Sequence, residues 1–390
     1  TALGYISQTA TTTGNNNTSS GAYSLRYNTT GTENAAFGTY SLYCNTTGAC
    51  NVAVGSCALR NNTSGTRNVA VGFCTLKANT TGVYNVAVGK MALDANTSGY
   101  SNSAVGMHAL GSNTSGYQNT GCGYGAGGSI TTGDNNVAVG HVAGGSITTG
   151  DDNTAVGQNS LAALTTGSQN NAFGINALDA LTTNTQCNAF GTMALTSLSS
   201  STAKCNAFGQ QALQDCTTGN ANSAFGHDVL RECTSGSYNT GFGHAALQVS
   251  TTASSNTCIG SSAGYTITTG SNNICLGKEA IPTSATVGDQ IILGNAGNND
   301  LRCNDQSISA LSDARDKTDV VDLPVGLSFI DSIRPVKFKW ASRDGNGNDG
   351  KTRAGFLAQE LQTASADATY LNLVMNDNPE KLVAKYGNLI

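Results

Sequence analysis

Asn51-Val52-Ala53-Val54-Gly55-Ser56-Cys57-Ala58-Leu59-Arg60-Asn61-Asn62-Thr63-Ser64-Gly65-Thr66-Arg67 is one unit of a repeat, and the next unit opens with Asn68-Val69-Ala70-Val71-Gly72. The glycine that ends the Asn-x-Ala-Val-Gly core returns every 17 residues from Gly4 to Gly191. One inserted residue then shifts the series, which continues on period to Gly294. A fixed short period over about three quarters of the chain indicates a solenoid of roughly 18 stacked units.

The composition agrees with a repeat rod better than with an ordinary enzyme. Charged residues make up only 11% of the 390 residues, and 48 residues are glycine. Such a chain has little material for one large core, but stacked coils can bury a narrow one. The net charge of -5 argues against nucleic acid or an anionic membrane as a partner, because both select basic faces. No apolar stretch is long enough to span a bilayer, so we expect no membrane insertion.

Each repeat is too short for two helices and a turn. Its Asn-x-Ala-Val/Phe-Gly core is β-branched or aromatic, which predicts a short strand. The Asn-Thr-Thr/Ser-Gly segment that follows predicts a turn. The turn glycine, Gly65 in the quoted unit, is replaced by Asn184 in a later unit. Because asparagine is the usual substitute where φ must be positive, we expect a left-handed backbone conformation at this glycine.

Stacked coils bring equivalent side chains to the roughly 4.8 Å spacing of neighbouring strands, so identical residues should form rows. We expect the core asparagines to hydrogen-bond to one another along the rod. An ion-binding or receptor-reading row is the alternative. Small and large apolar residues alternate in a further row, as in Ala58-Leu59 and Ala92-Leu93, which suits a thin core. We call the rows of stacked core asparagines and glycines the structural ladder. It includes Asn51, Asn68, Asn85, Asn102, Gly55, Gly72 and Gly89.

The chain has 12 cysteines, and several of them follow the repeat. We expect these to be buried free thiols in ladder positions, with stacked disulfides or a metal site as alternatives. No C-x-x-C motif occurs, and no histidine lies at zinc-ligand spacing from a cysteine pair, so we predict no metal site and no cofactor. The cysteine pairs separated by one period, or by one period plus the insertion, are Cys57 and Cys74, Cys187 and Cys205, Cys216 and Cys233, and Cys258 and Cys275.

From Leu301 onward the period disappears, and 11 of the 19 Lys and Arg residues lie in this last part of the chain. The pattern of residues 326–333 predicts a short amphipathic helix. In residues 336–340 apolar and polar side chains alternate, which predicts a strand with one buried face. Residues 344–350 predict a hairpin loop that leads to a second strand at 352–356 and a helix near 358–361. Together they predict a small α+β domain that is separate from the rod.

The repeat resembles the left-handed β-roll heads of trimeric bacterial adhesins and related phage fibres over roughly residues 1–298. Units of that family are commonly nearer 14 residues long. A β-roll and a triangular β-helix, formed within one chain or shared by three, therefore both remain open. The resemblance implies a trimer.

The C-terminal segment carries a series of motifs, which are, in order, Ser312-Asp313-Ala314-Arg315-Asp316-Lys317-Thr318-Asp319, Gly326-Leu327, Ile333-Arg334-Pro335-Val336-Lys337-Phe338-Lys339-Trp340, Gly355-Phe356-Leu357-Ala358-Gln359-Glu360-Leu361 and Tyr386-Gly387-Asn388-Leu389-Ile390. In this order they resemble the endosialidase-type intramolecular chaperone domain, which ends many phage tailspikes and fibres. We place this domain at 312–390, after a linker at 299–311. The family normally continues into helices that help it trimerise, so we expect the domain to be truncated at Ile390 or to have a reduced trimerising part.

The resemblance implies that the chain cleaves itself at the Leu311–Ser312 bond, with Ser312 as nucleophile and Lys317 as general base. A serine hydroxyl needs a neighbour to take its proton, and a lysine can do so if burial lowers its pKa toward neutrality. All four histidines lie in the rod, which argues against a Ser-His-Asp triad. Taken alone, a serine and a lysine five residues apart also fit a solvated turn. We expect single-turnover self-cleavage only, and no enzymatic activity in the rod.

These features predict a structural, host-contacting bacteriophage tail fibre, made as a homotrimer, assembled in the bacterial host cytoplasm and located in the virion. Its expected partners are a host surface receptor or glycan and other tail proteins. Near-identical repeats can pair in the wrong register, so a domain that trimerises first would set the register and then be released. Only the insertion between Gly191 and Gly209 is expected to mark the register within the rod. The alternatives are the head of a trimeric bacterial surface adhesin and a non-catalytic part of a glycan-degrading tailspike.

Overall fold

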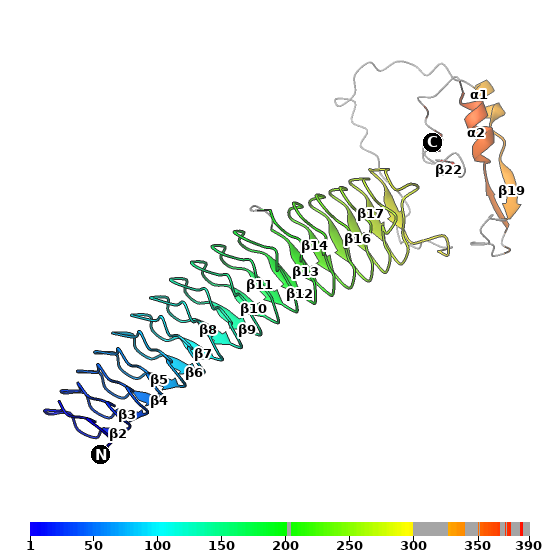
Figure 1. Ribbon diagram of the computed structural model, residues 1–390. Helices are drawn as coiled ribbons and strands as arrows, with labels where there is room; N and C mark the ends of the chain where they lie inside the picture. The colour runs from blue at the N-terminus through cyan, green and yellow to red at the C-terminus, as the bar shows by residue number, and fades with distance from the viewer. Residues whose placement is uncertain are drawn as a thin grey trace, which may run out of the picture.

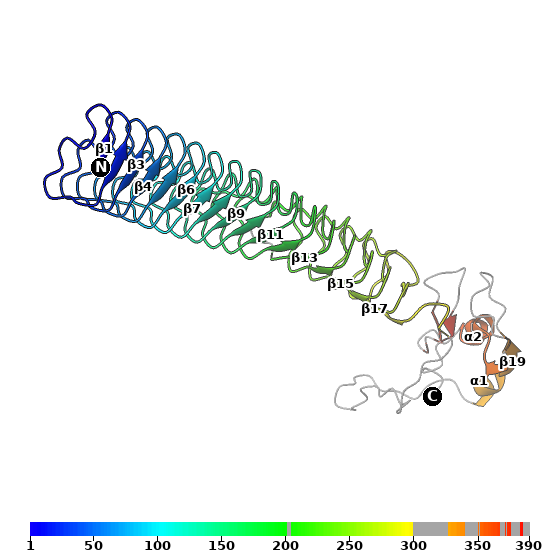
Figure 2. The same ribbon diagram turned by 90° about the horizontal axis from the view of Figure 1, so that it is seen from below.

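The protein is a long β-solenoid rod followed by smaller elements. Residues 1–200 and 204–298 form stacked coils, one coil per repeat, with a strand on the same side of every coil (Figure 1). Figure 2 shows the same stack after a quarter turn, with the strands in one line along the rod. The predicted mostly β fold with a 17-residue period is confirmed. The computed structural model describes residues 1–200, 204–298, 327–339, 350, 352–366, 371, 373–375 and 383–384.

The strands of the rod form one 18-stranded parallel sheet. The register is one-to-one, since Val52 pairs with Val69 and Ala53 with Ala70. The inserted residue leaves this pairing intact, because Asn188 pairs with Asn206. The strands are β1 (Ala2–Leu3), β2 (Thr18–Ser20), β3 (Ala35–Phe37), β4 (Val52–Val54), β5 (Val69–Val71), β6 (Val86–Val88), β7 (Ser103–Val105), β8 (Thr120–Cys122), β9 (Val137–Val139), β10 (Thr154–Val156), β11 (Asn171–Phe173), β12 (Asn188–Phe190), β13 (Asn206–Phe208), β14 (Ser223–Phe225), β15 (Thr240–Phe242), β16 (Thr257–Ile259), β17 (Ile274–Leu276) and β18 (Ile291–Leu293).

The rest of each coil is also bonded to its neighbours through the backbone. The Leu59 N–H donates to the Thr75 carbonyl at 3.0 Å, and the Thr63 N–H donates to the Thr80 carbonyl at 3.0 Å. Both acceptors belong to the next coil of the same chain. Each coil is therefore formed within one chain. The alternative, in which three chains share each coil, is excluded.

The interior of the rod is narrow and combines small with large side chains. Ala53 at the centre of its strand, together with Ala58 and Leu59, is fully buried, and the same positions are buried in coil after coil. Alternating a methyl group with an isobutyl group lets side chains interdigitate in a core only a few atoms wide. This is the apolar row that the sequence predicts.

Buried asparagines form a hydrogen-bonded row through the rod. The Asn85 side-chain amide donates to Asn68 Oδ1 at 3.1 Å and to the Gly99 carbonyl at 2.8 Å, while the Asn85 backbone N–H donates to the same Oδ1 at 3.0 Å. Asn51 and Asn102 lie in the same row and make equivalent bonds. Each amide is thus bonded on both sides, as a buried polar group requires.

A second asparagine row runs beside the first, in the segment that the sequence predicts only as a turn. The Asn79 amide donates to Asn62 Oδ1 at 2.8 Å and to the Gly82 carbonyl at 3.1 Å. The row ends at Asn113, whose Oδ1 is buried without a hydrogen-bond partner in the described part of the chain. Ile130 takes the equivalent position in the next coil, so the row changes there from amide to apolar side chains.

The predicted reason for the turn glycines is wrong. Their φ values are not positive, and a side chain is excluded there by close approach instead: a Cβ on Gly65 would lie 2.4 Å from Asn62 Oδ1 and 2.4 Å from the Gly82 carbonyl oxygen. Positive φ is found in the other glycine row, at the end of each strand, where Gly55 has a φ of 131°. Only glycine adopts that conformation readily.

The cysteines that follow the repeat are free thiols, and most of them are buried. Cys187, Cys216 and Cys258 have no exposed surface, whereas Cys57 is half-buried. Burial raises the pKa of Cys187 to about 12, because the interior disfavours the thiolate. These residues therefore behave as small apolar side chains, in keeping with the prediction.

Candidate functional site

The described elements of the C-terminal segment are a hairpin, two short helices and a small strand pair. The elements are α1 (Leu327–Ser332), β19 (Val336–Lys339), β20 (Thr352–Gly355), α2 (Ala358–Ala364), β21 (Val374–Met375) and β22 (Val383–Ala384). The strands β19 and β20 are antiparallel, with Val336 opposite Gly355, and β21 pairs antiparallel with β22. The expected small domain with a short sheet and helices is confirmed, and its elements start and end within a few residues of the predicted positions.

Alternation in β19 gives this hairpin one half-buried side. Val336 and Phe338 are half-buried, while Lys337 and Lys339 are exposed. Half-burial of every second side chain is what a strand with one covered face produces.

An ion pair joins the loop before β19 to α2. Arg334 Nε lies 3.1 Å from Glu360 Oε2, and its Nη2 contacts the other carboxylate oxygen. A guanidinium and a carboxylate that meet through two pairs of atoms have a fixed relative orientation. Next to Glu360 in α2, Leu361 is buried, and Leu373 before β21 is buried as well. These contacts place the Arg334-Pro335 corner against the helix that follows the hairpin.

The predicted catalytic residues lie outside this described framework. Leu311, Ser312 and Lys317 belong to residues whose structure is not described, as do Trp340 and most of the predicted hairpin loop. Self-cleavage at the Leu311–Ser312 bond therefore stays a prediction. The structural ladder residues named from the sequence all lie in the rod, where the asparagines are buried and the glycines end the strands.

Residues 312–370 match the family model described as the chaperone of endosialidase. The chain fits a phage tail fibre that ends in a chaperone domain. The chaperone segment, residues 312–370, begins at Ser312 and contains the α1, β19, β20 and α2 elements. Its similarity supports a chaperone and autocleavage role in a phage tail protein. A comparison with curated proteins found no match. Within the described residues, no helix is both long enough and apolar enough to cross a membrane.

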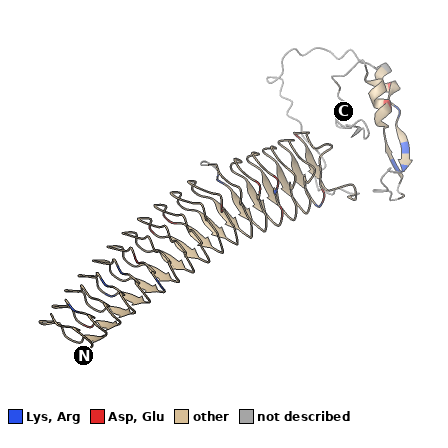
Figure 3. Ribbon diagram, viewed as in Figure 1, with Lys and Arg blue, Asp and Glu red and all other residues tan. Residues whose placement is uncertain are grey.

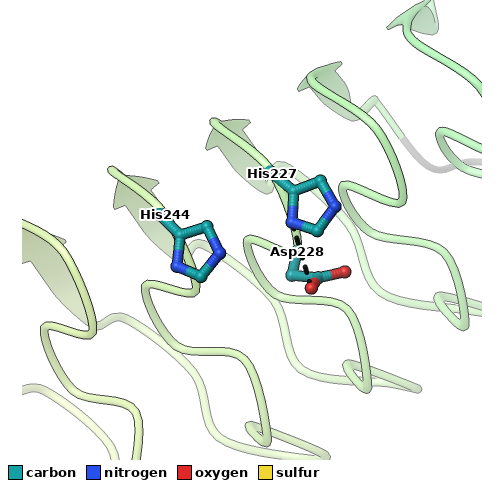
Figure 4. A group of neighbouring side chains, drawn as sticks. All are labelled: His227, Asp228 and His244. Carbon is teal, nitrogen blue, oxygen red and sulfur yellow. Dashed lines mark ion pairs between the residues drawn. The ribbon is translucent and has the colours of Figure 1, made fainter.

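Sequence reasoning missed one cluster of ligating side chains on the rod. His227, Asp228 and His244 lie together on neighbouring coils, and each offers one atom that could bind a metal ion (Figure 4). The available signal was the spacing of 17 residues between the two histidines, which places them in one row. A search for zinc motifs with short spacings could not find it, because the solenoid and not the local sequence brings these residues together.

Proposed function

We propose that this protein is a structural tail fibre that contacts the host surface and folds as a homotrimer. Its C-terminal segment assists that folding and is then released by cleavage at the Leu311–Ser312 bond. The observation that carries the proposal is the chaperone match at residues 312–370, which follows a rod built from a single repeated coil.

The rod itself supports the need for a folding helper. Each strand pairs with the next in the same one-to-one register, and most coils present the same alanine and asparagine to their neighbours. A chain or a neighbouring copy displaced by one coil would keep most of these contacts, so the wrong arrangement costs little energy. A terminal segment that brings three chains together first would remove that ambiguity.

Within the proposal, Ser312 is the nucleophile and Lys317 the base that accepts its proton. Attack of Ser312 Oγ on the Leu311 carbonyl carbon transfers the acyl group from the Ser312 nitrogen to its oxygen. Water then hydrolyses the ester and leaves a carboxylate on Leu311 and a free amine on Ser312. The family match begins at Ser312, which supports its place at the junction of two products. Release of the helper would make assembly effectively irreversible.

The chaperone role is tested by expressing the chain with and without residues 312–390. The complete chain should give soluble particles whose mass by light scattering corresponds to three copies. A chain ending at Leu311 should give aggregates or single copies, because nothing sets the register of its rods. A complete chain with Ser312→Ala is the matched control, since it keeps the helper and lacks only the nucleophile. Equal yields of trimer from the shortened and complete chains would contradict the proposal.

A further inference from the structure

The outward side of the rod's sheet carries one apolar row along almost its whole length, beside a second row that is polar in most strands. The polar residues of that second row are Thr18, Ser103, Thr120, Thr154, Asn171, Asn188, Asn206, Ser223, Thr240 and Thr257. Each strand from β2 to β17 buries its middle residue and turns the first and third outward. None of the described strands β1 to β18 contains a charged residue, and Figure 3 shows the strand arrows of the rod in the uncharged colour. We name the third residues the outer apolar row: Phe37, Val54, Val71, Val88, Val105, Cys122, Val139, Val156, Phe173, Phe190, Phe208, Phe225, Phe242, Ile259, Leu276 and Leu293.

This row is a continuous apolar strip that runs along the rod, and several of its side chains are well exposed. Phe37 is 42% exposed, Val105 46% and Phe242 56%. Sixteen rungs at about 4.8 Å, each contributing about half of a strand roughly 10 Å long, give a strip roughly 75 Å long with an area of roughly 350 Å². The largest apolar patch on a monomer is about 300–600 Å², so the strip is distinguished by its length and its regular spacing rather than by its area.

We propose that the outer apolar row is the surface along which copies of this chain associate side by side, parallel and in register. The proposal rests on the proposed homotrimer and identifies the face that forms it. The partner is a second copy because only a rod with the same rise per coil can match sixteen rungs in sequence. A second copy would also present an uncharged strand face, so no charged side chain would be buried between the two rods.

The row also has a direction, which favours the parallel arrangement. The rings of Phe190 and Phe208 stack at 4.7 Å with an interplanar angle of 5°, and the same stack extends from β11 to β14. Smaller valines occupy most of the row from β4 to β10. In a parallel, symmetric assembly the phenylalanine blocks meet at one level and the valine blocks at another. An antiparallel pair would set large against small side chains along the rod.

Two exposed cysteines provide a direct test on the unchanged chain. Cys122 lies in the outer apolar row, whereas Cys50 is exposed outside it. N-ethylmaleimide should modify Cys122 at least about tenfold more slowly than Cys50 in the native assembly, and at a similar rate in denaturant, as read by peptide mass spectrometry. The hydrogen bond to Glu33 raises the pKa of Cys50 and slows this reference thiol, so the comparison is conservative.

A substitution pair in one coil gives the second arm of the test. Phe242→Asp places a charge in the row and should weaken association at least about tenfold by sedimentation. Tyr238→Asp changes another exposed aromatic residue, 65% exposed, and should leave association unchanged, since Asp152 occupies the same position in an earlier coil. A trimer in which Cys122 reacts as fast as Cys50 overturns the proposed surface and leaves the trimer standing. A single-copy wild type overturns the homotrimer itself.

A separate observation concerns the cluster on the coils of β14 and β15. The His227 and His244 rings are parallel, with centroids 5.4 Å apart and an interplanar angle of 2°. Asp228 Oδ2 lies 3.1 Å from His227 Nδ1, and the ligating atoms of all three residues lie within 4.8 Å of one another (Figure 4). Ala245, the residue equivalent to Asp228 in the next coil, is small and leaves the carboxylate next to His244.

The carboxylate of this cluster has an unused acceptor. Asp228 is only 9% exposed, and its Oδ1 is buried without a hydrogen-bond partner among the described residues. Arg231 Nη1 lies 3.9 Å from Oδ1, beyond hydrogen-bond distance, and Arg231 is already paired with Glu232 at 2.8 Å. A buried carboxylate oxygen without a donor calls for a cation or a water molecule.

We infer that His227, Asp228 and His244 form a binding site for a divalent transition metal ion such as Zn²⁺. Two imidazoles and a carboxylate are a common ligand set for zinc, with water completing the tetrahedron. Zinc ligands lie about 2.0–2.2 Å from the ion and therefore roughly 3.3 Å from one another. The His227–Asp228 distance already fits this geometry. The His244 ring is exposed, and its ligating atom lies within 4.8 Å of the other two, so it must move closer to complete the set.

Calorimetric titration of the complete chain with Zn²⁺, after alkylation of accessible thiols, tests this site. One ion per chain should bind, and His244→Ala or Asp228→Asn should weaken binding at least about tenfold. His141→Ala is the matched control, because His141 occupies the row of His227 but stacks on Tyr124. Thermal unfolding without zinc should show that each variant is folded. Absent binding by the wild type, or equal weakening by His141→Ala, would overturn the site.

Discussion

Replacing Ser312 with alanine should keep the chain at its full 39.6 kDa on denaturing electrophoresis, whereas the unchanged chain should separate into two pieces. Alanine removes the proposed nucleophile, and loss of such a hydroxyl slows acyl transfer on the order of 10⁴-fold or more. N-terminal sequencing of the smaller piece should read Ser312-Asp313-Ala314. That sequence would place the cut at the predicted bond.

Two further variants separate the chemistry from a general effect on folding. Lys317→Arg keeps the positive charge but removes a base that can lose its proton near neutral pH, so cleavage should fail here too. Ser309→Ala removes a hydroxyl three residues before Ser312 and should cleave like the unchanged chain. A Ser312→Ala chain that still separates, or an unchanged chain that stays whole, would contradict self-cleavage. In either case the rod and its strand register would be unaffected.

The rod could be predicted from the sequence because its period aligns like residues. Val52 and Val69 share a position in the unit, and they are paired in the sheet. The same alignment made the asparagine row a reasonable expectation, since a buried amide one coil above another finds both a donor and an acceptor. The repeat thus carries the register as well as the presence of the strands.

The path of the chain outside the strands could not be predicted in this way. Cys57, Leu59 and Arg67 all have positive φ, and equivalent residues do so in most other coils. A left-handed conformation at these residues is unfavourable in isolation. It persists because each coil is bonded to the next, as in the Leu59 to Thr75 contact. The local sequence does not predict these positive φ values, because contacts between coils stabilise them.

The rod also marks its register at more places than the insertion alone. The second asparagine row changes to isoleucine between Asn113 and Ile130, and the first changes to cysteine between Asn170 and Cys187. A slip of one coil would set an amide against an apolar side chain at each change. The register is therefore partly specified by the rod, and the proposed helper adds to that specification.

Sequence analysis identified one of the two candidate sites, the Ser312 and Lys317 pair, and missed the other, the cluster at His227. Ser312 and Lys317 belong to an ordered series of motifs, and the family match supports that reading. The cluster at His227 was not found, because its residues lie 17 positions apart and meet only when coils stack. Chemistry created by stacking is invisible to a search over short spacings.

Replacing Gly123 with alanine should destabilise the rod by about 3 kcal/mol or more, through backbone strain and steric overlap. Gly123 ends β8 with a φ of 132°, which L residues rarely adopt. A Cβ there would lie 2.5 Å from the Gly140 carbonyl oxygen. That oxygen belongs to the backbone of the next coil, which the sheet holds in place. Equilibrium unfolding in urea, followed by circular dichroism, measures the loss.

Gly125, two residues further along the same coil, is the matched control. Its φ of 62° is also positive, but a Cβ there would meet only Val142 Cγ2, at 3.8 Å. His108 and Val142 occupy the same position in the neighbouring coils with φ values of 59° and 54°, so side chains are accepted there. Gly125→Ala should cost only about 1–2 kcal/mol, the conformational penalty of an L residue in the left-handed region, because no neighbouring atom obstructs its Cβ. Equal losses from both variants would mean that conformation alone, rather than the close approach of successive coils, requires glycine at the end of each strand.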